Sequence, residues 1–195
     1  MTKSRSRSAV PWVVGLVLAA VFLAAIGLGQ LLGLPGLWHS GPTTSLGRSL
    51  PTRLAIPDVG VRAKVVEVGK ADDGSIATPT ADPVNAAGWY RLGPTPGESG
   101  TAVIVGHVDT ANEPAVFAKL GDLKRGKRVE VSRSDRRTAA FVVDSVERFP
   151  KTAFPAQRVF AQSDRPRLVL ITCGGAWLGG PVGYADNVIV FATLA

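Results

Sequence analysis

Short apolar runs separated by polar turns repeat along the chain from residue 52 onward. Thr101–Gly106 and Arg167–Thr172 are continuous and rich in β-branched residues, which indicates strands buried on both faces. Val59–Val68 alternates apolar and polar positions, which is typical of a half-buried strand. Further strands are expected at Arg53–Pro57, Lys127–Arg133, Thr138–Val146 and Asn187–Ala192. About eight short strands with little helix predict a mainly β fold, either a closed barrel or a sandwich.

Two segments between the strands have a different character. Val84–Leu92 is expected to form a short helix or turn, with Trp89 and Tyr90 as core anchors. Glu113–Leu120 has helical character, because its apolar residues recur on one face of a helix.

The N-terminal part of the chain is dominated by a long apolar run. No charged residue occurs from Ala9 to Gly47, and residues 11–34 are almost wholly apolar. A helix needs about 20 such residues to cross a bilayer. The preceding residues carry three basic side chains and no acid, so the positive-inside rule keeps the N-terminus in the cytoplasm.

These observations predict four regions. Residues 1–10 form a basic cytoplasmic N-terminus, residues 11–34 a single transmembrane anchor, residues 35–51 an extracellular linker, and residues 52–195 an extracellular globular domain. A cleaved signal peptide is the alternative to the anchor. The apolar run is longer than the usual h-region of about 7–15 residues, and residues 36–40 lack a convincing cleavage site.

Length, charge and hydropathy fit this layout. The 195 residues suit one compact domain with appendages, and the mean hydropathy of +0.20 is raised by the apolar run. The net charge is +7, with a basic cluster at Lys124–Arg137. On an extracellular domain this cluster either meets anionic wall or lipid groups or keeps the domain soluble, and the topology argues against nucleic acid. No cofactor is expected, and no metal site, because Asp72, Asp73 and Asp82 lack ligand spacing.

Cys173 is the only cysteine, and it follows one of the two buried strands. Outside the membrane, structural cysteines normally form pairs, so an unpaired thiol points to chemistry. A small buried core residue is the other reading. His107 follows the second buried strand and is the only histidine after His39, which lies in the linker. If the two strands are neighbours, an imidazolium stabilises the thiolate and acts as a general acid.

Several motifs in the domain resemble the sortases, the membrane-anchored cysteine transpeptidases of Gram-positive cell surfaces. Leu170-Ile171-Thr172-Cys173 looks like the family's L-x-T-C motif, and Gly106-His107 looks like its strand-borne histidine. The wider phrases VIVGHVDT, FPAQRVF, LVLITCGG and GYADNVIVFA look most like the class F sortases of actinobacteria. The resemblance covers about residues 52–195 and implies an eight-stranded β-barrel.

The resemblance also implies a reaction and a place for it. Cys173 would attack the Thr–Gly carbonyl of an LPXTG-like sorting signal on a secreted surface protein and hold it as a thioester. His107 would protonate the leaving amine and then activate an incoming amine, from a cell-wall precursor or a pilin lysine. Thr172 would position the substrate or the oxyanion. The enzyme would sit in the cell membrane as a single-pass protein with its catalytic domain outside.

One departure from the family pattern concerns arginine. Sortases usually carry an arginine at the start of the last strand, but no Lys or Arg follows Arg167. Asn187 falls near that position, and its amide can donate to an oxyanion without arginine's charge. Arg158 is another candidate, whereas Arg167 lies six residues before Cys173, about 20 Å along an extended strand. The third residue of the site therefore remains unassigned.

Three alternatives share part of this evidence. An L,D-transpeptidase would carry a histidine two positions before the cysteine, where this chain has Ile171. A thiol hydrolase that releases the thioester to water would use the same residues. A non-enzymatic anchored β-domain would bind a wall polymer or a partner and keep Cys173 buried.

Overall fold

The computed structural model describes residues 44–80, 84–180 and 183–195. The predicted N-terminus and anchor, at 1–10 and 11–34, lie outside these residues, as does most of the predicted linker. Within the described part of the chain, no helix has both the length and the apolar character needed to cross a membrane.

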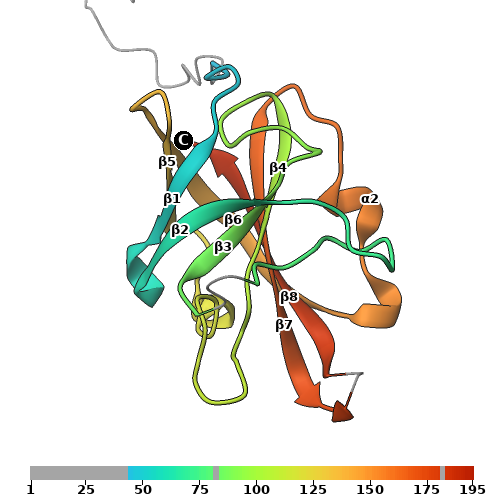
Figure 1. Ribbon diagram of the computed structural model, residues 1–195. Coiled ribbons are helices and arrows are strands. Elements are labelled where there is room, and N and C mark those ends of the chain that lie inside the picture. Colours follow the sequence, from blue (N-terminus) through green and yellow to red (C-terminus); the bar gives the residue numbers. More distant parts are fainter. Residues whose placement is uncertain (1–43, 81–83, 181–182) are drawn as a thin grey trace, which may run out of the picture. The chain divides into compact units, whose positions relative to one another are not determined.

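Eight strands close into a barrel in the order β1-β2-β3-β4-β7-β8-β6-β5 (Figure 1). The strands are β1 (Pro51–Ile56), β2 (Val61–Val68), β3 (Ala86–Tyr90), β4 (Gly100–Val105), β5 (Arg128–Arg133), β6 (Thr138–Pro150), β7 (Pro166–Trp177) and β8 (Tyr184–Leu194). The helical pieces are η1 (Pro57–Val59), η2 (Leu120–Asp122), η3 (Lys151–Ala153) and α2 (Ala156–Val159). The predicted eight-stranded β-barrel is therefore confirmed.

The two buried strands of the sequence prediction are neighbours in the barrel. β4 and β7 pair in parallel from Gly100↔Pro166 to Val105↔Ile171, and β7 also pairs with β8 in antiparallel fashion. The strands expected at Lys127–Arg133 and Thr138–Val146 correspond to β5 and β6, which pair in antiparallel fashion. The parallel pairing matters for function, because it sends β4 and β7 toward the same end of the barrel.

Two apolar clusters explain why these strands are continuously apolar. The barrel interior takes up alternate residues of β7 such as Leu168 and Leu170. The intervening residues Val169 and Ile171 belong to a second cluster, which also contains Val159 of α2. Since both faces of β7 are covered from Leu168 to Ile171, this run is apolar on both faces, and the next residues are Thr172 and Cys173.

Two predictions of local structure differ from the structure. Turns occur at residues 84–85 and 91–92, but residues 86–90 between them form strand β3, because pairing with β2 and β4 outweighs the weak local preference. Trp89 is nevertheless a core anchor, with 1% of its surface exposed. Residues 113–119 form bends and turns rather than a helix, and helical geometry appears only in the short η2. The segment instead bonds back to the end of β4, where Phe117 N–H donates to the His107 carbonyl.

Residues just before the expected domain start at residue 52 contact the barrel. Arg133 has a fully buried side chain that donates to the carbonyl oxygens of Leu46 and Gly47, at 3.3 and 2.9 Å, and also to that of Pro96. Its guanidinium pairs with the Asp135 carboxylate at 3.0 Å. These contacts attach the end of the expected linker to the barrel.

Candidate active site

The parallel pairing of β4 and β7 brings His107 and Cys173 together. The last register pair is Val105↔Ile171, and Gly106 N–H donates to the Ile171 carbonyl at 3.1 Å. His107 lies two residues beyond Val105 and Cys173 lies two residues beyond Ile171, so both residues lie near the point where β4 ends beside β7. The Cys173 thiol is free and half-buried rather than enclosed. An imidazole and an accessible thiol therefore share one end of the barrel.

Both the ring and the backbone of His107 make hydrogen bonds. Its ring nitrogen Nε2 lies 3.1 Å from the carbonyl oxygen of Pro79, and its own carbonyl accepts from Phe117 N–H at 3.0 Å. Because a carbonyl oxygen can only accept, this contact places a proton on Nε2. In the neutral ring Nδ1 is then the basic nitrogen.

Asn187 lies directly opposite Cys173 in the β7–β8 ladder. Directly opposed residues of an antiparallel pair project to the same face, with Cβ atoms about 4.5–5.5 Å apart. The carboxamide of Asn187 is therefore close enough to the thiol to donate a hydrogen bond to a group bonded to sulfur.

Thr172 faces away from the thiol. Successive side chains of a strand point to opposite faces, and Thr172 shares the parity of the interior residue Leu170. Its side chain is 4% exposed, and its Oγ1 has no hydrogen-bond partner among the described residues. The structure does not place this hydroxyl on the face where Cys173 and Asn187 meet.

Arg158 is engaged elsewhere. Its guanidinium donates to both carboxylate oxygens of Glu147 at 2.6 Å and lies 3.8 Å from the centre of the Phe191 ring. The bond from Arg158 holds the pKa of Glu147 below its ordinary value, and the same bond raises the pKa of Arg158. Phe191 is four residues along β8 from Asn187, about 13 Å in an extended strand. The structure therefore does not bring Arg158 to Cys173.

Arg167 is also remote from the thiol. It pairs with Thr101 on β4 and with Thr193 on β8, near the opposite end of β7. Neither arginine considered from the sequence stands beside the cysteine.

The sequence analysis did not select Asp109 and Tyr184 as site residues. The Tyr184 hydroxyl donates a hydrogen bond to the carboxylate of Asp109, across 75 residues of chain. This bond raises the pKa of Tyr184 above its ordinary value, and burial and the negative charges of Asp109 and Cys173 act in the same direction. Tyr184 therefore lies within electrostatic reach of the thiol. Both residues occur in the phrases VIVGHVDT and GYADNVIVFA, which were the available signal.

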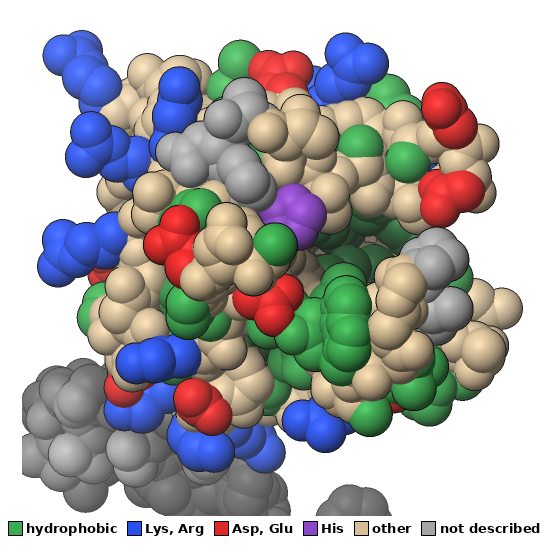
Figure 2. All heavy atoms as spheres, turned by 60° about the horizontal axis from the view of Figure 1, so that its bottom comes forward, with side chains coloured by type: hydrophobic (Ala, Val, Ile, Leu, Met, Phe, Trp, Pro, Cys, Tyr) green, Lys and Arg blue, Asp and Glu red, His purple; other side chains and the backbone are tan. Residues whose placement is uncertain are grey.

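The surface around the histidine is hollowed and partly apolar. Figure 2 shows the imidazole, in purple, at the edge of a hollow bordered by hydrophobic side chains. Exposed apolar residues follow Cys173 in the chain: Trp177 and Leu178 are 62% and 60% exposed. The Trp177 ring packs edge-on against Tyr184, with centroids 5.0 Å apart.

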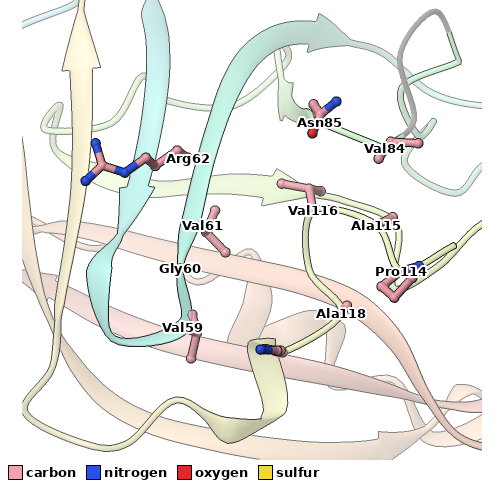
Figure 3. Close-up of a pocket in the computed structure, with 11 residues that line it drawn as sticks. Val59, Gly60, Val61, Arg62, Val84, Asn85, Pro114, Ala115, Val116 and Ala118 are labelled. Carbon is pink, nitrogen blue, oxygen red and sulfur yellow. The ribbon is translucent and has the colours of Figure 1, made fainter.

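A cavity of about 340 Å³ is lined in part by the segment that follows His107 (Figure 3). It is lined by Val59–Arg62, Val84, Asn85, Pro114–Val116, Ala118 and Lys119. Neither Cys173 nor His107 lines it, so this cavity is distinct from the thiol–imidazole pair. Among the described residues, no group of three or more His, Cys, Asp or Glu side chains is arranged to hold a metal ion.

Comparisons with known proteins agree with this geometry. The sequence matches the family model described as "Sortase domain" over residues 54–195. A search of curated proteins found no match.

Solved structures with a similar fold come from several bacteria. A lid mutant of sortase A from Corynebacterium diphtheriae superimposes with a TM-score of 0.58 at 19% identity, covering 76% of this chain and 72% of that one. Sortase C2 of group B Streptococcus Pilus Island 1 superimposes with a TM-score of 0.56 at 19% identity, covering 73% of this chain and 72% of that one. Sortase A from Listeria monocytogenes superimposes with a TM-score of 0.55 at 19% identity, covering 75% of this chain and 88% of that one. At these identities the likeness concerns the fold.

Proposed function

Because the chain belongs to the sortase family of cysteine transpeptidases, which cleave sorting signals, we propose that Cys173 and His107 perform this reaction on an LPXTG-like signal. The observation that supports the assignment is the β4–β7 register, in which Val105, two residues before His107, pairs with Ile171, two residues before Cys173. The accessible position of Cys173 supports it, since a purely structural cysteine would be enclosed.

The first half of the reaction forms a thioester. The Cys173 thiolate attacks the carbonyl carbon of the Thr–Gly bond, and the carbonyl oxygen becomes an oxyanion. When the oxyanion collapses, the carbon–nitrogen bond breaks and the His107 imidazolium transfers its proton to the departing amine. The products are an acyl-enzyme and a free peptide that begins with glycine.

The second half transfers the acyl group to an amine. Neutral His107 accepts a proton from the incoming amine as it attacks the thioester carbon. The carbon–sulfur bond breaks, Cys173 leaves as a thiolate, and a new amide is formed. Atoms and charge balance without any cofactor. A cell-wall precursor or a pilin lysine supplies the amine in this proposal.

In this proposal Asn187 stabilises the oxyanion. It is opposite Cys173, and its amide N–H can donate to an oxygen on the carbon bonded to sulfur. It brings no positive charge, so its contribution is smaller than that of a guanidinium fork.

The proposal includes the cellular setting expected from the sequence. Residues 11–34 would anchor the protein in the cell membrane with residues 1–10 in the cytoplasm, and the barrel would face outward. The quoted phrases support assignment to the class F subtype. The test is to add a protease to intact cells. The barrel should be cleaved if it faces outward and protected if it lies in the cytoplasm.

The reaction is tested with a peptide library built on LPXTG-like motifs. The wild-type protein should release a glycine-led fragment and, with an added amine, produce the ligated amide. Cys173→Ala and His107→Ala should each abolish both products. Cleavage retained by Cys173→Ala would refute the assignment, and release to water alone, with no amide formed, would identify a hydrolase.

Labelling of the thiol separates the enzyme from a binding module. Under native conditions, Cys173 should react with an alkylating reagent in the folded protein, and its reactivity should depend on His107. A thiol that reacts only after unfolding would favour the non-enzymatic β-domain.

A further inference from the structure

The bond between Asp109 and Tyr184 spans the catalytic strand. Asp109 lies two residues after His107, in the segment that follows β4, and Tyr184 is the first residue of β8. In the barrel β7 lies between β4 and β8. The side-chain bond therefore passes over β7 and joins the two neighbours of the strand that carries Cys173.

The bond crosses β7 just beyond the thiol, where β7 has almost no side chains. Tyr184 pairs with Trp177, and the residues between Cys173 and Trp177 are Gly174, Gly175 and Ala176. A Cβ atom at Gly175 would lie 2.3 Å from the Asp186 carboxylate, so the strand here accepts no larger residue. The missing side chain at Gly175 leaves room for the Asp186 carboxylate, two residues along β8 from Tyr184.

Each end of the bond is fixed by its own surroundings. The Tyr184 ring packs edge-on against Trp177. Asp109 sits in a tight loop, in which Thr110 N–H donates to the Glu113 carbonyl at 2.8 Å and Ala115 N–H donates to the Val108 carbonyl at 3.0 Å. Since neither end can relax far, the bond constrains the distance between the His107 segment and β8.

We propose that Asp109 and Tyr184 are a pair of positioning residues that hold His107 in register with Cys173 and Asn187. The proposal rests on the proposed transpeptidase function. The pair acts through the backbone on either side of the thiol: Asp109 fixes the segment two residues from the imidazole, and Tyr184 fixes the strand three residues from Asn187. Neither residue is required to contact the scissile bond.

The central variant is Tyr184→Phe, which removes one oxygen and keeps the ring on Trp177. Misplacing a catalytic group by about 1 Å costs roughly 100-fold in rate. We expect kcat for the sorting peptide to fall about 10- to 100-fold with KM nearly unchanged. Tyr90→Phe removes the same atom from the only other tyrosine, which packs on Phe160, and should leave kcat at the wild-type value.

Asp109 variants separate the bond from the charge. Asp109→Ala removes the acceptor and should match Tyr184→Phe. Asp109→Asn keeps an acceptor oxygen and should retain most of kcat. Because the pair acts as one unit, Tyr184→Phe combined with Asp109→Ala should lose no more than the worse single variant. The proposal is overturned by an unaffected Tyr184→Phe, by multiplicative losses, or by Asp109→Asn being as slow as Asp109→Ala.

A readout without catalysis shows whether the bond exists in solution. In a Tyr90→Phe background, Tyr184 is the only tyrosine, so ultraviolet absorbance follows its ionisation alone. The bond to Asp109 raises the pKa of Tyr184, so Asp109→Ala should shift the titration to lower pH. If the Tyr184 titration is unchanged in Asp109→Ala, the proposed bond is refuted, even if this variant is less stable than the wild type.

The proposed function and the positioning pair fail in different ways. If wild type and Tyr90→Phe both leave the peptide library uncut, the proposed function is wrong and the pair has no catalytic role. If both cut the peptide and Tyr184→Phe cuts it equally fast, the function stands and the pair is refuted.

Discussion

Gly106 links β4 to His107 at a position where no side chain fits. A Cβ atom placed there would lie 2.6 Å from Cδ2 of Phe117 and 2.7 Å from Cγ1 of Val116. Phe117 is fully buried, so its ring cannot move into solvent to make room. Gly106→Ala must therefore displace the 116–117 segment or the end of β4.

The size of the effect follows from these contacts. Inserting a methyl group into a packed core costs about 1–3 kcal/mol. Replacing glycine also restricts the unfolded chain, which returns about 0.4–1 kcal/mol where the backbone allows alanine. The net loss is about 1–2 kcal/mol. For a chain of this size that is a fall in Tm of about 2–8 °C.

Activity should fall by more than stability suggests. The displaced segment is the one whose Phe117 N–H donates to the His107 carbonyl, so the imidazole shifts with it. A displacement of about 1 Å would lower kcat roughly 100-fold. Cleavage of the sorting peptide, measured well below the melting transition, would separate this loss from unfolding.

Gly121→Ala is the matched control. The nearest atoms to its Cβ position are the Val188 methyl carbons at 3.9 and 4.0 Å, which is ordinary contact. This variant should melt at or slightly above the wild-type temperature and keep full activity. The reasoning is refuted if Gly106→Ala melts no lower than Gly121→Ala, or if it melts lower but cuts the peptide at the wild-type rate.

Three further variants test other parts of the structure. Asn187→Ala should lower kcat about 100-fold or more if its amide stabilises the oxyanion, measured as kcat at saturating peptide; a wild-type kcat would remove it from the mechanism. Arg158→Met should leave cleavage unchanged and cost at most about 1 kcal/mol, because its ion pair with Glu147 is half-exposed. Because Arg158 lowers the pKa of Glu147, the ion pair stabilises the fold above the unfolded-state pKa of Glu147, and this stabilisation is lost as pH falls through the lower folded-state pKa. The free energy of unfolding of wild type and Arg158→Met, measured as pH is lowered, should therefore converge. Arg133→Met should cost about 3 kcal/mol and expose residues 44–50 to proteolysis, since three carbonyl oxygens and Asp135 lose a buried donor.

The sequence pattern was sufficient for the barrel and for the central pair. Residues 102–105 of β4 and 168–171 of β7 are all apolar because both faces are covered, and His107 and Cys173 each lie two residues beyond these runs. The remaining condition, that these strands be neighbours in parallel, is a property of strand order. No local pattern determines it, and the structure supplies it.

Contacts between distant segments were beyond local reasoning. β3 forms because β2 and β4 offer partners on both sides, although its own segment contains Gly88 and reads as a turn. Arg158 pairs with Glu147 because α2 covers the β8–β6 face, which the spacing of the two residues does not reveal. Asp109 follows β4 and Tyr184 begins β8, and the two residues can bond because these strands lie on either side of β7 in the barrel.

The electrostatic balance of the site follows from what surrounds the thiol. No Lys or Arg follows Arg167 in the sequence, so β7 beyond that point and all of β8 contribute no cation. They do contribute Asp186, which packs against Gly175 two residues from Cys173. In the proposed mechanism these two segments bring no cation to Cys173, so the reaction depends more strongly on the position of His107. This gives a physical reason for the bond between Asp109 and Tyr184, which fixes the segment beside His107.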